Sequence, residues 1–334
     1  MKKRFLEDLF LKTILGIKII LSLAKTSLIN LITGGAGFLG SHLIDKLMQN
    51  KEKVVCIDNF LTGNKSNISN WLDNSNFNLI NHDIRKPLDI KADKIWHFGC
   101  PASPSKYQLN PILTTEINFL GTFNMLKLAQ KNNAKFLLAS SSEIYGNPKQ
   151  HPQKEDYFGN VNPIGKRSCY EVGKRISESL CNDFARLNSL EIRIVRIFNT
   201  YGPRLSKNDG RVISNFITQA LSNKPLTIYG DGSQTRTFCY VTDLISALIK
   251  VMNNNYLEPI NIGSEKEIKI IDLANLIRNK INPSLPIKKL PLPEDDPQKR
   301  KPDLSIAKNV LHWEANTDID SGLDSTISYL QETY

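Results

Sequence analysis

Two Tyr-x-x-x-Lys pairs are the first residues whose spacing points to chemistry. Tyr170 and Lys174 lie in a run with helical periodicity, where residues four apart share a face, so the ammonium is expected beside the phenol. A phenol with a pKa of about 10 is a poor base near neutral pH, and a neighbouring cation favours phenolate. The other pair, Tyr145 and Lys149, encloses a Gly-Asn-Pro sequence that cannot hold a helical turn. Tyr170 and Lys174 are therefore the predicted acid–base pair.

A serine-rich sequence precedes this pair, at the end of the strand expected over residues 135–139. It places Ser141, Ser142 and Glu143 where a strand gives way to a loop. By itself the sequence is typical of a polar turn. If the strand belongs to a nucleotide-binding sheet, these hydroxyls and the carboxylate are expected to face the same cleft as Tyr170.

A glycine-rich turn indicates such a sheet. The apolar strand expected over residues 28–32 leads into Gly34, Gly37 and Gly40, and a leucine at every fourth position marks the helix that follows. The first glycine permits a tight turn, the second lets the backbone approach a pyrophosphate, and the third lets the helix pack closely. The pyrophosphate then binds at the helix N-terminus, at Phe38 and Leu39, where free N–H groups favour an anion.

The residue at the end of the next strand, expected over residues 53–57, predicts which dinucleotide binds. Asp58 lies about 20 residues beyond the glycines, where a carboxylate bonds the ribose 2′-hydroxyl and repels a 2′-phosphate. This favours NAD over NADP, with Asn59 beside it. Asp83 and Ile84 follow the third strand and are expected near the adenine ring.

The alternation of strands and helices predicts the frame that holds these residues. The expected elements are a strand over 94–98, a helix over 113–131, the strand over 135–139, a helix over 170–187 and a strand over 191–197. This pattern predicts an α/β fold with a doubly wound parallel Rossmann sheet. We expect the NAD-binding domain over residues 28–198. After it, proline and glycine become frequent, which predicts a smaller, interleaved C-terminal substrate lobe over 199–334, with a return to the sheet near 237–263.

Composition is typical of a folded protein, with 40% hydrophobic and 23% charged residues among 334. The formal charge of +10 suits an anionic partner or, equally, a solvated basic surface. No nucleic-acid-binding motif is present, so we expect no nucleic acid partner. Five cysteines, none in a C-x-x-C pair, and five dispersed histidines predict reduced thiols, a cytoplasmic location and no metal site.

The N-terminal extension, residues 1–27, has a basic start and an apolar stretch that lysines interrupt. It falls short of the ~20 apolar residues that a spanning helix needs, so we expect no stable membrane span. An amphipathic helix lying on the domain or on a membrane surface is the prediction.

Longer motifs add a family resemblance. From about residue 28 onward, the sequence resembles the extended short-chain dehydrogenase/reductase family, and within it the UDP-glucuronate decarboxylases. The motifs that carry the resemblance are residues 100–104, 110–111, 121–126, 140–146, 151–153, 161–163, 169–170, 196–204, 209–212, 232–236 and 295–303. Relatives usually have threonine where Ser141 stands and many have lysine at Glu116.

The resemblance implies a reaction on a nucleotide sugar. Tyr170, with Ser141 and Lys174, removes the C4 hydroxyl proton while hydride passes to NAD⁺. The C4 ketone is β to the carboxylate, so carbon dioxide leaves; C5 is then protonated and the hydride returns, which regenerates NAD.

The resemblance also implies the remaining site residues. Ser142, Glu143 and Arg300 would handle the carboxylate and the C5 proton. Thr200 would contact the cofactor. The implied substrate-binding residues are Asn199, Arg211, Tyr229, Arg236 and Arg300.

Alternatives remain at this point. A 4,6-dehydratase would typically have Asp-Glu where Ser142 and Glu143 stand, and a 4-epimerase would retain the carboxylate. A non-catalytic dinucleotide-binding sensor would be expected to lose the Tyr-Lys pair. Family members usually form homodimers through the helices expected over 113–131 and 170–187. An apolar stripe that includes Ile176 and Leu187 fits that interface or burial against the sheet.

Overall fold

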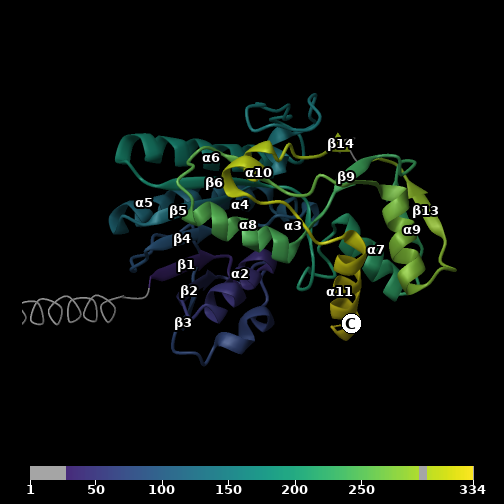
Figure 1. Cartoon of the computed structure of the whole chain (residues 1–334), viewed down its shortest axis with the longest axis horizontal. Helices are drawn as coiled ribbons and strands as arrows, with labels where there is room; N and C mark the ends of the chain where they lie inside the picture. Colours follow the sequence, from purple (N-terminus) through teal and green to yellow (C-terminus); the bar gives the residue numbers. More distant parts are fainter. Residues whose placement is uncertain (1–27, 293–298, 334) are drawn as a thin grey trace, which may run out of the picture.

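The chain is built around a fully parallel, seven-stranded sheet of strand order β3-β2-β1-β4-β5-β6-β11 (Figure 1). The computed structural model describes residues 28–292 and 299–333, so the predicted N-terminal extension lies outside the described residues. The strands are β1 (Ile29–Thr33), β2 (Lys53–Asp58), β3 (Phe77–Asn81), β4 (Lys94–His97), β5 (Lys135–Ser141), β6 (Ile192–Ile197) and β11 (Ile260–Ile262). The predicted doubly wound sheet is confirmed.

Helices cover both faces of this sheet because successive strand residues point to opposite sides. Leu137 of β5 packs in the cluster under α2 (Phe38–Gln49), α8 (Val241–Asn253) and α10 (Ser305–Leu311). Its neighbours in the strand, Phe136 and Leu138, pack in the cluster under α5 (Thr122–Asn132) and α6 (Ser168–Asn188).

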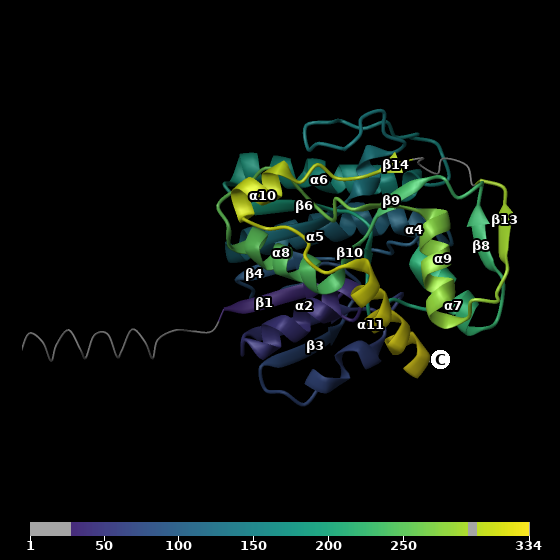
Figure 2. The same cartoon turned by 45° about the vertical axis from the view of Figure 1, so that its right-hand side comes forward.

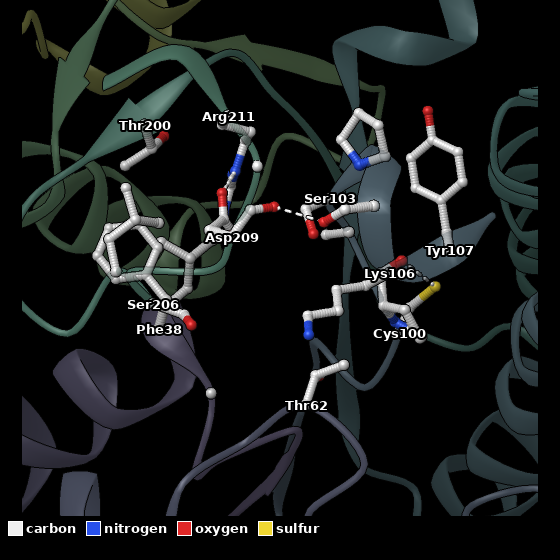
Figure 3. Close-up of a pocket in the computed structure, with 18 of the residues that line it drawn as sticks. Phe38, Thr62, Cys100, Ser103, Lys106, Tyr107, Thr200, Ser206, Asp209 and Arg211 are labelled. Atoms are coloured by element: carbon white, nitrogen blue, oxygen red, sulfur yellow. Dashed lines mark hydrogen bonds and ion pairs between the residues drawn. The ribbon is translucent and has the colours of Figure 1, made fainter. Parts of the chain in front are cut away.

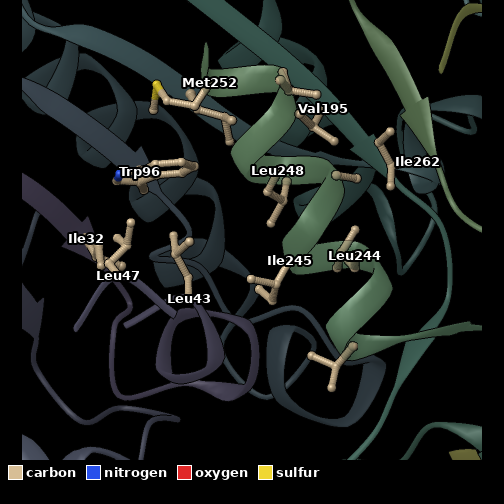
Figure 4. Close-up of a cluster of buried hydrophobic side chains, with 14 of the residues drawn as sticks. Ile32, Leu43, Leu47, Trp96, Val195, Leu244, Ile245, Leu248, Met252 and Ile262 are labelled. Carbon is tan, nitrogen blue, oxygen red and sulfur yellow. The ribbon is translucent and has the colours of Figure 1, made fainter. Parts of the chain in front are cut away.

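Figure 4 shows the first of these clusters, in which α8 lies against side chains from α2 and the sheet. Leu244, Ile245 and Leu248 of α8 are at most 4% exposed. Leu304, Leu311 and Trp313 also belong to this cluster. A late stretch of the chain, within the range expected for the smaller lobe, therefore packs on the sheet.

The single helix expected over residues 113–131 is interrupted. α4 (Pro111–Glu116) continues as a π-helical segment, Ile117–Gly121, and then as α5. The π segment holds the buried Asn118. Its side-chain Nδ2 donates to the Thr114 carbonyl, and its backbone carbonyl accepts from the Ser177 hydroxyl of α6. π segments in helices often occur at functional sites, and this one lies beside the cavity described below.

The smaller lobe has its own apolar core at one end of the sheet (Figure 2). Its elements are α7 (Val212–Leu221), β8 (Leu226–Tyr229), α9 (Ile270–Ile281), β13 (Ile287–Leu290) and α11 (Ile319–Glu332). No helix in the described ranges is long and apolar enough to cross a membrane.

The remaining elements are short. They are 3₁₀ turns at Lys65–Trp71 and Ser142–Tyr145, α3 (Pro104–Tyr107), and strands β7 (Thr200–Tyr201), β9 (Thr235–Thr237), β10 (Cys239–Tyr240), β12 (Glu267–Lys269) and β14 (Lys299–Arg300). β14 pairs with β9 in parallel and sets Arg300 opposite Arg236. A two-residue strand thus places a predicted site residue in a small three-stranded sheet of order β12-β9-β14.

Candidate active site

One cavity of about 1290 Å³ opens at the carboxyl ends of the sheet strands, between the sheet and the smaller lobe. Every site residue predicted from the sequence lines it, from Gly34 at one end to Arg300 and Tyr229 at the other. Its volume exceeds that of a pocket for a single drug-sized molecule. The cavity therefore has room for two ligands side by side.

The glycine turn forms one wall. Gly34 has φ +67°, and a Cβ on it would lie 3.0 Å from the Gly99 backbone. A Cβ on Gly40 would lie 2.3 Å from the Gly34 carbonyl oxygen, so α2 can begin this close to β1 only without a side chain there. Gly37, the residue before α2, supplies no side-chain cap, which leaves the first N–H groups of α2 free for an anion.

Asp58 supports that turn from the end of β2. Its Oδ2 accepts from the Ala36 N–H at 2.9 Å and its Oδ1 from the Phe60 N–H at 2.8 Å. Burial raises the pKa of the Asp58 carboxyl, and these two hydrogen bonds oppose the rise. A fixed carboxylate beside uncapped helix N–H groups fits the ribose and pyrophosphate of NAD. Asn59, Asp83 and Ile84 line the same end of the cavity.

Tyr170 lies deep in the cavity, in a tightly packed setting. Its ring stacks on Tyr107 with centroids 4.9 Å apart, and its hydroxyl hydrogen-bonds with Ser141. The Lys174 ammonium lies 5.7 Å from the Tyr170 ring centroid and donates to the Ala139 carbonyl at 3.0 Å. Burial, with a smaller contribution from Cys100, raises the pKa of the Tyr170 phenol.

The raised pKa of Tyr170 is opposite to the effect expected from Lys174, since a neighbouring cation favours the phenolate. The ammonium is fixed on a backbone carbonyl, and the phenol is shielded from water by the Tyr107 ring. Because desolvation disfavours the charged form, Tyr170 is protonated in this structure. Its use as a base requires further positive charge in the cavity.

Glu143 is the second residue of the 3₁₀ turn after β5 and lies between two arginines. Arg300 Nη1 donates to Glu143 Oε1 at 2.8 Å and to Ser142 Oγ at 3.3 Å. Arg167 Nη2 donates to Glu143 Oε2. Burial by itself would raise the pKa of the Glu143 carboxyl, but the guanidinium groups of Arg300 and Arg167 hold it at about 2. Glu143 is therefore ionised.

Basic and polar groups of the smaller lobe form the opposite wall. Arg211 pairs with Asp209, with Nη2 and Oδ1 2.9 Å apart, and Figure 3 shows this pair across the cavity from Cys100 and Tyr107. Arg236 Nη1 donates to the Thr235 carbonyl at 2.9 Å. Asn199, Thr200 and Tyr229 complete this wall.

Comparison with known proteins identifies the family. A model described as the NAD dependent epimerase/dehydratase family matches residues 30–263. UDP-glucuronic acid decarboxylase 1 of Danio rerio is 51% identical over 299 residues, which cover 90% of this chain and 72% of the relative. The chain belongs to the NAD dependent epimerase/dehydratase family, and within it to the UDP-glucuronic acid decarboxylases. UDP-glucuronic acid decarboxylase 3 of Arabidopsis thaliana is 53% identical over 294 residues, covering 88% of this chain and 86% of that one.

A solved structure of a nucleotide-sugar epimerase shares the fold. UDP-glucuronic acid 4-epimerase from Bacillus cereus, solved with UDP-glucuronic acid and NAD, superposes with a TM-score of 0.82 at 28% identity, covering 92% of this chain and all of that chain (100%). The resemblance seen in the sequence is thus confirmed at the level of the family.

Sequence reasoning missed several residues that the fold brings to this decarboxylase-family cavity. Arg167, Tyr107 and Cys100 all line it. Cys100 belongs to one of the motifs that carry the family resemblance, and Arg167 lies three residues before Tyr170. The spacing of neither residue predicts its place in the cavity wall. Glu116, where many relatives have lysine, pairs with Arg85 at 2.5 Å and is absent from the cavity wall.

Proposed function

We propose that this chain converts UDP-glucuronate to UDP-xylose and carbon dioxide, using NAD that is bound tightly and regenerated in each cycle. The observation that carries the proposal is the Glu143–Arg300 pair, which lines the same cavity as Tyr170. A guanidinium group with a fork of donors suits a sugar carboxylate. The family membership and the identity of about half the residues with curated decarboxylases support the same substrate.

The chain's own residues supply the proton transfers. Tyr170 accepts the proton of the C4 hydroxyl of the sugar. Ser141, which is hydrogen-bonded to Tyr170, orients the C4 hydroxyl. NAD⁺, when bound, contributes positive charge beside the phenol and takes up and returns the C4 hydride. Lys174 holds its ammonium near the Tyr170 ring and favours the phenolate as it forms.

Loss of the carboxylate follows from the C4 ketone. The ketone is β to C6, so the C5–C6 bond can break with its electron pair delocalised into an enolate, and carbon dioxide leaves. C5 then takes a proton, for which Glu143 and Ser142, both bonded to Arg300, are the candidates that the family resemblance implies. Arg211 and Arg236, with Asn199 and Tyr229, would hold the nucleotide diphosphate and the uracil end.

The direct test is the product formed by purified protein. Incubation with UDP-glucuronate is expected to give UDP-xylose and one carbon dioxide per sugar, with no net consumption of NAD, because the hydride returns to the substrate. Proton NMR of the sugar and detection of carbon dioxide check both products. UDP-galacturonate would identify a 4-epimerase instead, and unchanged UDP-glucuronate would also contradict the proposal.

A homodimer is proposed on the exposed apolar side chains of the α4–α5 run and α6. The exposed fractions are 73% for Ile112, 40% for Phe119, 38% for Ile176 and 75% for Leu187. Phe119 also stacks near Phe123, and α4 and α6 are neighbours. An apolar face of this kind is typical of a twofold interface.

Light scattering after size exclusion is expected to give twice the 37.7 kDa chain mass. A Phe119→Asp, Ile176→Asp double variant should elute as a monomer, because two charges would be buried at a twofold interface. Leu257→Asp, at a 51% exposed leucine away from these helices, is the matched control and should stay dimeric. A wild-type monomer would refute this assembly.

We also infer a cytoplasmic location. All five cysteines are free thiols. Reduced cysteines without disulfides are typical of cytosolic proteins.

A further inference from the structure

Arg167 is a largely enclosed cation at the active site with no role in the reaction proposed above. It directly precedes α6, its side chain is 13% exposed, and it lines the cavity. Its Nη2 donates to Glu143 Oε2, and its Nε donates to Glu171 Oε1 at 3.1 Å. The backbone carbonyl of Arg167 accepts from the Tyr170 N–H at 3.0 Å. Arg167 thus links the helix that carries the base to Glu143.

Arg300 donates to the other oxygen of the Glu143 carboxylate. Its Nη1 lies 2.8 Å from Glu143 Oε1, and its Nη2 donates to the Gly146 carbonyl at 2.6 Å. The Arg300 side chain is only 2% exposed. The two arginines therefore present donors from two sides to one carboxylate, which we call the arginine clamp (Arg167 and Arg300).

The clamp is open to the cavity. Glu143 keeps 20% of its side chain exposed, and both arginines line the cavity with it. A sugar carboxylate is the same chemical group as the one the clamp already holds. A substrate that enters the cavity therefore competes with Glu143 for the same donors.

We propose that the arginine clamp is a carboxylate-exchange site, occupied by Glu143 in the free protein and by the C6 carboxylate of the uronic-acid nucleotide during turnover. This inference rests on the proposed function, because it takes a uronate as the substrate. It assigns Arg167, together with Arg300, to substrate recognition.

Exchange gives Glu143 two states with different chemistry. Held in the clamp, it is ionised, because the guanidinium groups keep its pKa at about 2, and it cannot donate a proton. Released from the clamp in a buried site, its pKa rises towards and above that of an ordinary carboxyl group. It can then carry a proton close to the sugar.

Exchange also accounts for product release. Loss of carbon dioxide removes the anion from the clamp, and buried guanidinium groups are costly without a counter-charge. The Glu143 carboxylate then pairs again with Arg167 and Arg300. UDP-xylose has no carboxylate, so the clamp no longer holds it.

Binding measurements on a background that cannot turn over test this. In NAD-loaded Tyr170→Phe protein, calorimetry would give Kd for UDP-glucuronate and for UDP-xylose. Adding Glu143→Gln is expected to lower the Kd for UDP-glucuronate by about tenfold, because the neutral amide competes poorly for the clamp. The Kd for UDP-xylose should change by less than about twofold.

Changes at Arg167 should act in the opposite direction. Arg167→Met is expected to weaken UDP-glucuronate by about 10–100-fold and UDP-xylose by less than about threefold. Arg167→Lys, which keeps the charge without the fork, should fall between. Arg186→Met, at a 70% exposed arginine near the end of α6, is the matched control and should change neither Kd.

The Glu143→Gln and Arg167→Met variants separate carboxylate exchange from a purely structural role. If Glu143→Gln weakens UDP-glucuronate, or if Arg167→Met weakens both nucleotides equally, the exchange site is refuted. Turnover by the unaltered protein is read separately. Failure to form UDP-xylose would reject the proposed function. The ratio of the Kd values for UDP-glucuronate and UDP-xylose tests whether the arginine clamp is a carboxylate-exchange site.

Discussion

Tyr170→Phe is expected to lower kcat by about 10²–10⁴-fold while the purified protein keeps its NAD. The change removes only the hydroxyl that bonds Ser141, whereas the ring that stacks on Tyr107 at 4.9 Å remains. The cavity wall is therefore preserved, but no group at that point can take the C4 proton. Formation of UDP-xylose by NMR and the NAD released on denaturation are the two measurements.

Tyr107→Phe is the matched control. The Tyr107 hydroxyl is buried without a hydrogen-bond partner among the described residues, so its removal costs little while the stacked ring stays. This variant should keep most of the activity. An equal loss in both variants would contradict the assignment, because it would mean that the Tyr170 hydroxyl contributes no more to turnover than the Tyr107 hydroxyl.

The glycine turn, Asp58 and the Tyr170–Lys174 pair were predictable because each is a local feature. A glycine turn is specified by the strand before it and the helix after it, and the i, i+4 spacing is specified by one helix. The carboxyl ends of parallel strands meet at one edge of the sheet, so these segments were also expected to share a cleft.

Arg167 could not be predicted in this way. Its contact with Glu143 depends on how the segment between the 3₁₀ turn at Ser142–Tyr145 and α6 folds back on itself. No periodicity encodes that path. The same holds for the pairing of Arg300 with Arg236, which two very short strands create. Arg300 was predicted as a site residue only from the family resemblance, because it lies in the motif over residues 295–303.

The electrostatic environment was the other feature outside sequence reasoning. Spacing places Lys174 near Tyr170, but it does not say that the ammonium donates to the Ala139 carbonyl or that burial dominates the phenol's pKa. Likewise, the glutamate at position 116 pairs with Arg85, which only the fold reveals. Partners and burial are tertiary properties, and they decide pKa direction.

Gly40→Ala is expected to yield protein that retains little NAD, with affinity lower by more than about 100-fold, because the site for the pyrophosphate is made of backbone. A Cβ at this position would lie 2.3 Å from the Gly34 carbonyl oxygen and 2.7 Å from Gly35 Cα. These are backbone atoms, and Gly34 is itself held against Gly99, so α2 must move away from the turn. Cofactor content and a titration with added NAD measure the loss.

The contrast with Tyr170→Phe makes this second prediction specific. Gly40→Ala should lose cofactor and activity together and regain part of its activity at high NAD, whereas Tyr170→Phe should keep cofactor and gain nothing from added NAD. Lys46→Ala, on the exposed side of α2, is the control for a change in the same helix and should behave like the unaltered protein. Full NAD content in Gly40→Ala would show that the close approach of α2 to β1 is not what forms the pyrophosphate site.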